Sequence, residues 1–173
     1  MSNISRLVSP FPDCNFTFRL QARRISSEEE NSAMYEALNE LEMRGKTHLE
    51  RLAIRTVKPS LVYMLTHLDQ PLRVPELSRI ADVSCSHFFA LFKRATGQTP
   101  ISYFTRVRMR RACKMLLETS LSVKEIAASL GYEDEFYFSR LFKSVHQLAP
   151  SYYRAQCASQ LSQFQSSPVA LRA

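Results

Sequence analysis

The chain has 173 residues, a formal net charge of +7 at pH 7 and 45% hydrophobic residues. This length suits one domain with an appendage, and the apolar content is sufficient for a hydrophobic core. No stretch resembles a membrane span or a secretory signal peptide, so we expect neither. The three glycines cannot supply a phosphate-binding loop, and the four cysteines and four histidines lack metal-ligand spacing. We therefore expect no cofactor, no metal site and no enzymatic activity.

The positive charge is concentrated after the first third of the chain. Residues 1–57 contain eight basic and eight acidic residues, whereas the remainder contains 15 basic and eight acidic residues. A basic module beside a neutral segment favours a polyanionic partner for the basic part.

The first 57 residues predict a short strand followed by two amphipathic helices. Residues Phe16–Leu20 alternate between apolar and polar side chains, as in a strand. Ser27 with Glu30, and Thr47 with Glu50, each have the spacing of a capping box that opens a helix. Two interpretations of the helices within residues 27–57 stay open, because amphipathic helices serve either purpose. They pair two subunits in a homodimer, or they pack on the rest of their own chain.

Prolines mark the next segment. Pro59 predicts the first turn of a helix that runs to about Asp69. Pro71 and Pro75 bracket the loop that follows this helix.

Two stretches of the chain, Pro75–Gly97 and Lys124–Gln147, repeat one another. Most matching positions are separated by 50 residues, and those before the short turn by 49. Self-similarity at a fixed spacing indicates a repeated structural unit. The matched pairs include Glu76 with Glu125, Phe88 with Phe138, Leu91 with Leu141, Phe92 with Phe142, Lys93 with Lys143, Pro100 with Pro150 and Tyr103 with Tyr153.

Each copy predicts a helix, a tight turn and a second helix. Ser84 and Asp134 are the candidate N-caps of the second helices, and Gly97 and Gly131 are candidate left-handed turn residues. One face of each second helix is apolar, and the opposite face is largely polar or basic. This is the helix-turn-helix pattern, whose second helix can enter a DNA major groove. The candidate DNA-contacting residues are Ser86, His87, Phe89, Ala90, Lys93 and Arg94 in the first copy, and Glu135, Phe136, Tyr137, Ser139, Arg140 and Lys143 in the second.

Between the copies, Thr99 caps and Pro100 starts a long helix that runs to about Thr119. Residues from about 58 to 156 then resemble the DNA-binding domain of the AraC/XylS family of bacterial transcription regulators. The second copy carries the strongest match, at Ala127, Gly131, Tyr132, Phe138, Ser139, Arg140, Phe142, Lys143, Pro150, Tyr153 and Arg154. Two positions depart from the family pattern: Phe89-Ala90 replaces a pair that is often polar or basic, and Gln147 replaces a usual glycine.

The resemblance implies an all-α fold in which two helix-turn-helix units, at about 75–97 and 123–147, are joined by the long helix at about 100–119. A short N-terminal strand and a two-helix segment precede them. The predicted division of the chain is an appendage (1–57), a DNA-binding domain (58–156) and a flexible tail (157–173). The appendage resembles the end of the sensor half of longer family members. Arg108 matches a usually basic position, where a structural role between the two halves is implied.

The predicted function is sequence-specific binding of double-stranded DNA by a transcription regulator, with two recognition helices reading successive major grooves. The implied partners are DNA, RNA polymerase and, through residues 27–57, a second subunit; the implied location is the cytoplasm, in association with the nucleoid. One alternative stays open. In it, the chain is an interaction module that pairs with a full-length relative and inhibits it.

Overall fold

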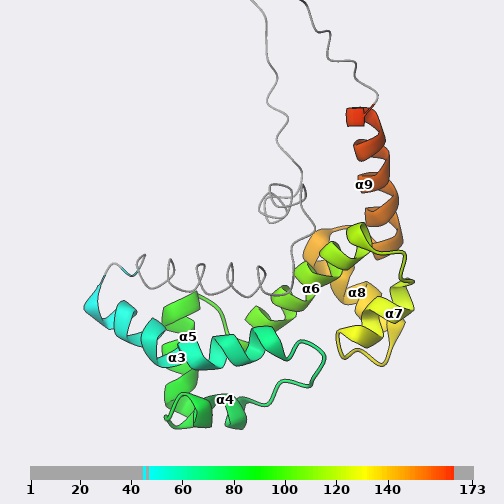
Figure 1. Cartoon of the computed structure of the whole chain (residues 1–173). Helices are drawn as coiled ribbons and strands as arrows, with labels where there is room; N and C mark the ends of the chain where they lie inside the picture. The colour runs from blue at the N-terminus through cyan, green and yellow to red at the C-terminus, as the bar shows by residue number, and fades with distance from the viewer. Residues whose placement is uncertain (1–44, 46, 166–173) are drawn as a thin grey trace, which may run out of the picture.

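The computed structural model describes residue 45 and residues 47–165, and this part of the chain is all-helical, without a strand. Figure 1 labels the helices, which are α3 (His48–Thr66), α4 (Val74–Ile80), α5 (Cys85–Thr96), α6 (Pro100–Glu118), α7 (Val123–Ser129), α8 (Glu135–His146) and α9 (Pro150–Gln165). The predicted strand at Phe16–Leu20 and the predicted helix opened by Ser27 lie outside the described residues. No helix in the described part is both long enough and apolar enough to cross a membrane.

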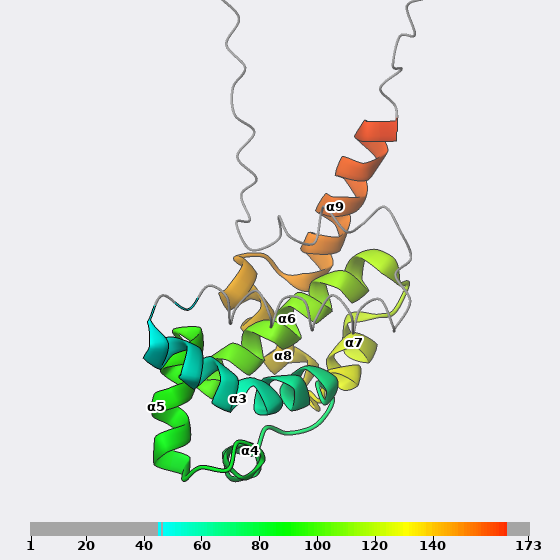
Figure 2. The same ribbon diagram turned by 60° about the vertical axis from the view of Figure 1, so that its left-hand side comes forward.

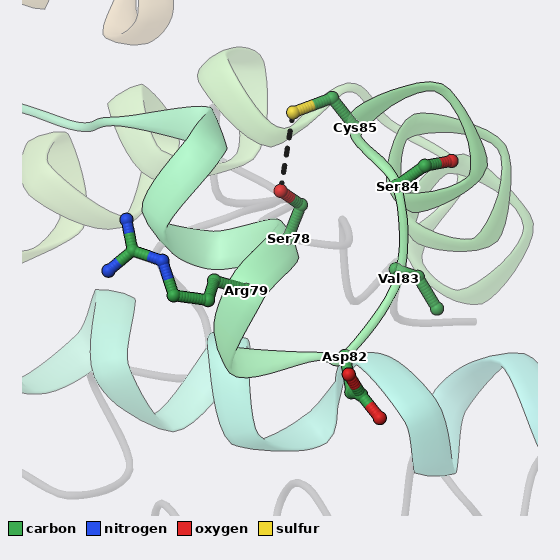
Figure 3. A pocket seen from close by; sticks show the side chains of 6 residues that line it. All are labelled: Ser78, Arg79, Asp82, Val83, Ser84 and Cys85. Atoms are coloured by element: carbon green, nitrogen blue, oxygen red, sulfur yellow. Dashed lines mark hydrogen bonds between the residues drawn. The ribbon is translucent and has the colours of Figure 1, made fainter.

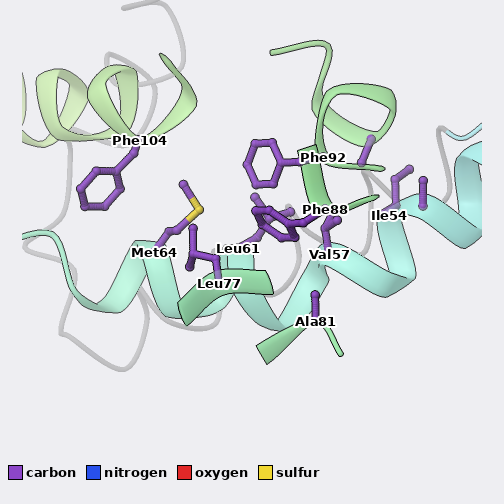
Figure 4. Packing of buried hydrophobic residues seen from close by; sticks show 11 residues of the cluster. Ile54, Val57, Leu61, Met64, Leu77, Ala81, Phe88, Phe92 and Phe104 are labelled. Carbon is purple, nitrogen blue, oxygen red and sulfur yellow. The ribbon is translucent and has the colours of Figure 1, made fainter. Parts of the chain in front are cut away.

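Two hydrophobic cores share the long helix α6. The first core packs α3, α4 and α5 against the start of α6, where Phe104 is its last contributor (Figure 4). The second core begins one turn later at Met109 and includes side chains of α7, α8 and α9. Figures 1 and 2 show α6 passing from one group of helices to the other. The described part of the chain therefore forms two small units, and α6 belongs to both.

The sequence repeat is reproduced in the packing of aromatic rings. Phe92 in the first unit and Phe142 in the second are both fully buried. Phe92 meets Tyr103 edge-on at 5.6 Å and 79°, and Phe142 meets Tyr153 at 5.6 Å and 78°. Edge-to-face packing is a preferred arrangement of aromatic pairs. The 50-residue shift seen in the sequence is therefore a repeat of structure as well.

Three predicted helix starts are confirmed by their capping hydrogen bonds. The backbone N–H of His87 donates to the Ser84 hydroxyl at 3.3 Å, and that of Phe136 donates to the Asp134 carboxylate at 2.8 Å. At the start of α3, Thr47 and Glu50 form the complete capping box. These bonds satisfy N–H groups that have no partner within the helix, and so they fix where each helix begins.

The prediction of a separate helix that starts at Pro59 is wrong. Pro59 lies inside α3, which continues without interruption from His48 to Thr66. A proline within a helix removes one backbone hydrogen bond and costs about 3 kcal/mol. Packing compensates, because buried side chains on both sides of the proline form one continuous stripe: Ala53, Ile54, Val57, Leu61 and Met64. The predicted limit between appendage and DNA-binding domain, at residues 57 and 58, falls within this helix.

The turns of the two units use different residues at one position. Asp82 has φ 53° and Gly131, which is 49 residues further on, has φ 73°. Both occupy the left-handed region, where glycine is free of strain and a short polar residue such as aspartate is tolerated. The lack of room for a side chain explains why position 131 is a glycine. An added Cβ there would lie less than 3.0 Å from the carbonyl oxygen of Asp69 and from Nη2 of Arg108.

The end of α8 carries a strained residue. Gln147 is the C-cap at φ 62°, whereas the equivalent cap of α5 is Gly97 at φ 75°. We expect Gln147→Gly to raise the free energy of unfolding by about 1 kcal/mol, because the left-handed region strains a residue with a Cβ. Denaturant unfolding measures this gain. The control is Ser144→Gly, inside the same helix, which should destabilise by about 0.5 kcal/mol. Equal effects of the two glycines would contradict the strain argument.

Candidate nucleic-acid interface

The two helices that follow the tight turns, α5 and α8, each bury one face and expose the other. Phe88 and Phe92 of α5, and Phe138 and Phe142 of α8, are fully buried in the two cores. Ten of the twelve candidate DNA-contacting side chains are exposed on the same helices; Glu135 and Ser139 are half-buried. The helical phase deduced from the sequence is therefore confirmed for both helices. The contacts of these side chains with DNA stay a prediction.

The turn of the first unit is fastened by a side-chain hydrogen bond between α4 and α5. The Ser78 hydroxyl lies 3.2 Å from the Cys85 thiol and shares a hydrogen bond with it, as Figure 3 shows. The same hydroxyl donates to the backbone carbonyl of Pro75 at 3.0 Å. A shallow pocket lies over this turn, lined by residues of α4, of the turn and of the start of α5. The first residue of α5 is thus held directly against the preceding helix.

The exposed face of α5 combines apolar and basic side chains. Phe89 is 39% exposed and is followed by Ala90 in the middle of the helix, where neither side chain carries a hydrogen-bond donor. Lys93 and Arg94 are exposed in the last turn. Apolar groups can contact the methyl group of thymine, and basic groups can contact phosphates. The exposed face of α5 therefore offers apolar groups in its middle and basic groups at its end.

The exposed face of α8 carries two large aromatic side chains and an arginine. Phe136 is 76% exposed and Tyr137 is 51% exposed, both in the first turn of the helix. Arg140 is exposed one turn further on, and Lys143 lies in the last turn. Within the part of the chain that the structure describes, no carboxylate forms an ion pair with Arg140. Arg140 thus places a long planar donor in the middle of α8, where α5 carries Phe89 and Ala90.

One buried polar contact of the second core was not deduced from the sequence. His146, the last residue of α8, is buried, with its Nε2 atom 3.4 Å from the thiol of Cys113. Its ring centroid lies 4.6 Å from that of Phe142. The equivalent position in the first unit is Thr96, so the repeat did not indicate a buried histidine here. The contact belongs to the packing beneath α8.

Helices α5 and α8 each bury one face, expose the other and follow a short helix and a tight turn. This arrangement defines a DNA-binding protein with two helix-turn-helix units. The comparisons with known proteins agree with this class. A family model for the helix-turn-helix domain matches residues 77–156. The chain belongs to the AraC/XylS family of transcription regulators.

Two relatives illustrate the similarity and its extent. The MmsAB operon regulatory protein of Pseudomonas aeruginosa is 39% identical over 92 residues, which are 53% of this chain and 30% of that protein. The transposon Tn10 TetD protein of Escherichia coli is 33% identical over 98 residues, which are 57% of this chain and 71% of that protein. The chain thus covers less than a third of the first relative and most of the second.

Solved structures match the same part of the chain. The C-terminal domain of AraT, a response regulator from Geobacillus stearothermophilus, has 30% sequence identity and a TM-score of 0.56, and the match covers 58% of this chain and 84% of that domain. The DNA-binding domain of AdpA, a global transcriptional factor solved with a target DNA, has a TM-score of 0.59 at 24% identity over 62% of this chain and 96% of that domain. The second match establishes the fold alone.

Proposed function

We propose that this protein is a transcription regulator that binds a specific DNA sequence by inserting α5 and α8 into two successive major grooves. The observation that carries the proposal is the repeated unit itself. Each recognition helix is held by its own buried phenylalanines and keeps an exposed face rich in side chains that can contact bases or phosphates. A single chain with two such units can span two groove faces, about 34 Å apart.

The second unit is proposed to read sequence more strictly than the first. Arg140 at the middle of the exposed face of α8 supplies a bidentate donor, and arginine contacting guanine O6 and N7 is the commonest specific contact. The middle of α5 offers Phe89 and Ala90, which discriminate through apolar contact with thymine methyl groups. The binding site should therefore have one strongly specified half and one laxer, A·T-leaning half.

The test of the proposal is selection of binding sites from a pool of random duplexes with the purified chain. We expect an enriched motif that covers two helical turns, with unequal information in its two halves. If the selection enriches no motif, the proposal of sequence-specific binding is overturned. Equal information in both halves, or a G·C-rich laxer half, would show that Phe89 and Ala90 do not face the bases. The Ala90→Arg variant should sharpen the laxer half and leave the other half unchanged.

Arg140→Ala should weaken binding to the selected site by about 1–3 kcal/mol and relax the preference at one base pair. The reason is that alanine cannot supply the two hydrogen bonds that distinguish guanine from the other bases. Fluorescence anisotropy on the selected duplex and on its single-base variants measures both effects. Lys143→Ala is the comparison, since the loss of a phosphate contact should weaken binding to all of these duplexes alike. A uniform loss for Arg140→Ala as well would assign Arg140 to the backbone.

The remaining expectations belong to the same proposal. The relatives are transcription regulators, which favours this function over the inhibitory interaction module. We expect the protein to act in the cytoplasm, in association with the nucleoid and with RNA polymerase as a further partner, and to catalyse no reaction. Pairing of two subunits through residues 27–57, and the division of the chain at residues 57 and 156, are part of the proposal. In the structure, α3 runs across the first of these limits and α9 across the second.

A further inference from the structure

We propose that Arg108 is a positioning residue that locks the two helix-turn-helix units at a fixed separation and thereby sets the spacing of the two half-sites. This inference rests on the proposed function, because a spacing between half-sites exists only if both units bind DNA. Arg108 lies near the middle of α6, between the last residue of the first core and the first residue of the second. It is an arginine with only 7% of its surface exposed.

The guanidinium of Arg108 ties α6 to the loop that leaves α3. Its Nε donates to the carbonyl oxygen of Leu68 at 2.8 Å, and its Nη2 donates to that of Gln70 at 2.5 Å. These carbonyls follow directly after the C-terminal end of α3, where the helix dipole favours a cation. A planar guanidinium can donate to two acceptors in fixed directions, which a lysine cannot do. The bond pair therefore fixes both the position and the angle of the loop.

The same guanidinium contacts one aromatic ring from each unit. Its central carbon lies 4.3 Å from the ring centroid of Phe104, in the first core, and 5.0 Å from that of Tyr132, in the turn of the second unit. Cations are attracted to the faces of aromatic rings. Burial raises the pKa of Tyr132, and hydrogen bonding to Arg108 opposes that rise. Arg108 is thus in contact with both units at once.

The two units also meet directly around this arginine. Leu68 packs against both hydrophobic cores. The backbone of Gly131 approaches the Asp69 carbonyl so closely that a Cβ would lie less than 3.0 Å from it. The two backbone segments are therefore in direct contact, with no room for a side chain between them. The junction formed by Leu68–Gln70, Arg108, Gly131 and Tyr132 is therefore a seam between the units.

The junction connects to the DNA-reading face of the second unit. The Tyr132 ring centroid lies 6.2 Å from that of Tyr137, which is exposed in the first turn of α8, and 5.5 Å from that of the buried Phe138. Tyr132 thus connects the seam with the start of the recognition helix. Among the described helices, α6 contributes buried residues to both cores, and its stretch between Phe104 and Met109 joins them. Long helices can curve gently, so the seam is what keeps the two recognition helices at one separation.

The chain offers a matched control in Arg154 of α9. Its Nε donates to the carbonyl oxygen of Leu116 at 3.1 Å and its Nη2 donates to that of Leu121, so it also ties a helix to a following loop. Leu116, Leu121 and α9, however, all belong to the second unit. Loss of Arg154 therefore removes an equivalent pair of bonds without touching the seam.

The experiment uses the full chain and the duplex that it selects from the random pool, with one or two base pairs inserted or deleted between the half-sites. We expect the wild type to show a sharp spacing optimum. Arg108→Met, which keeps the length of the side chain but none of its donors, should reduce the ratio of affinities for the optimal and the altered spacings by about fivefold to tenfold. Arg154→Met should leave that ratio unchanged. Arg108→Lys, which can reach only one carbonyl, should give an intermediate ratio.

A second readout does not need DNA. In ¹⁵N relaxation measurements the two wild-type units should tumble as one body, whereas in Arg108→Met their rotational correlation times should separate.

If neither Arg108 variant is folded, the same spacing series is measured on Tyr132→Leu, which removes the ring beneath the guanidinium. An unchanged spacing ratio in a folded junction variant, or a wild type that tolerates all spacings, overturns the inference. Failure of the random pool to yield any motif would instead overturn the proposed function.

Discussion

Phe142→Ala should lower the free energy of unfolding by about 3–5 kcal/mol, because it leaves a cavity in the second core. Phe142 is fully buried, and its ring lies within 5.6 Å of the ring of Tyr153 and within 4.6 Å of that of His146. These neighbours come from α9 and from the end of α8, so collapse around the cavity would require the helices to move. Denaturant unfolding followed by circular dichroism measures the loss.

The first unit provides the matched comparison. Phe92→Ala should have an effect of similar size, since Phe92 occupies the same place in the repeat and is equally buried. Lys93→Ala and Ser86→Ala, on the exposed face of the same helix, should leave the melting temperature nearly unchanged and lower DNA affinity. A larger stability loss for the exposed residues than for the phenylalanines would contradict the orientation of α5.

The repeat made most of this architecture predictable from sequence. A shift of 50 residues related two sets of phenylalanines, and the structure places both sets in equivalent cores with equivalent tyrosine contacts. Capping residues were also predictable, because Ser84 and Asp134 act on N–H groups only two or three residues away. Local signals of this kind depend on a few neighbouring residues.

Features that depend on contacts between distant parts of the chain could not be predicted from the sequence in this way. Pro59 predicts the first turn of a helix when seen locally, but the stripe of buried residues in α3 overrides that signal. The partners of Arg108 are backbone carbonyls about 40 residues away, and no side-chain pattern identifies them. The match to the family indicated that Arg108 has a structural role; the hydrogen bonds give its position at the seam.

Gly131→Ala should destabilise the chain by about 2–4 kcal/mol, which makes it one of the most damaging single-methyl additions available. Two causes act together. The left-handed backbone, at φ 73°, strains an alanine. The new methyl group would also lie less than 3.0 Å from the backbone oxygen of Asp69, so the seam between the units must open. Thermal and denaturant unfolding of the variant measure the loss.

Gly97→Ala separates these two causes. Gly97 has nearly the same backbone conformation, at φ 75°, but an added Cβ would meet no atom within 4 Å. This variant should therefore show only the conformational strain, about 1–2 kcal/mol. The difference between the two variants measures the cost of forcing the units apart. Equal losses at Gly97 and Gly131 would mean that the turn of the second unit can move away from Asp69 freely, and that the seam does not hold the two units together.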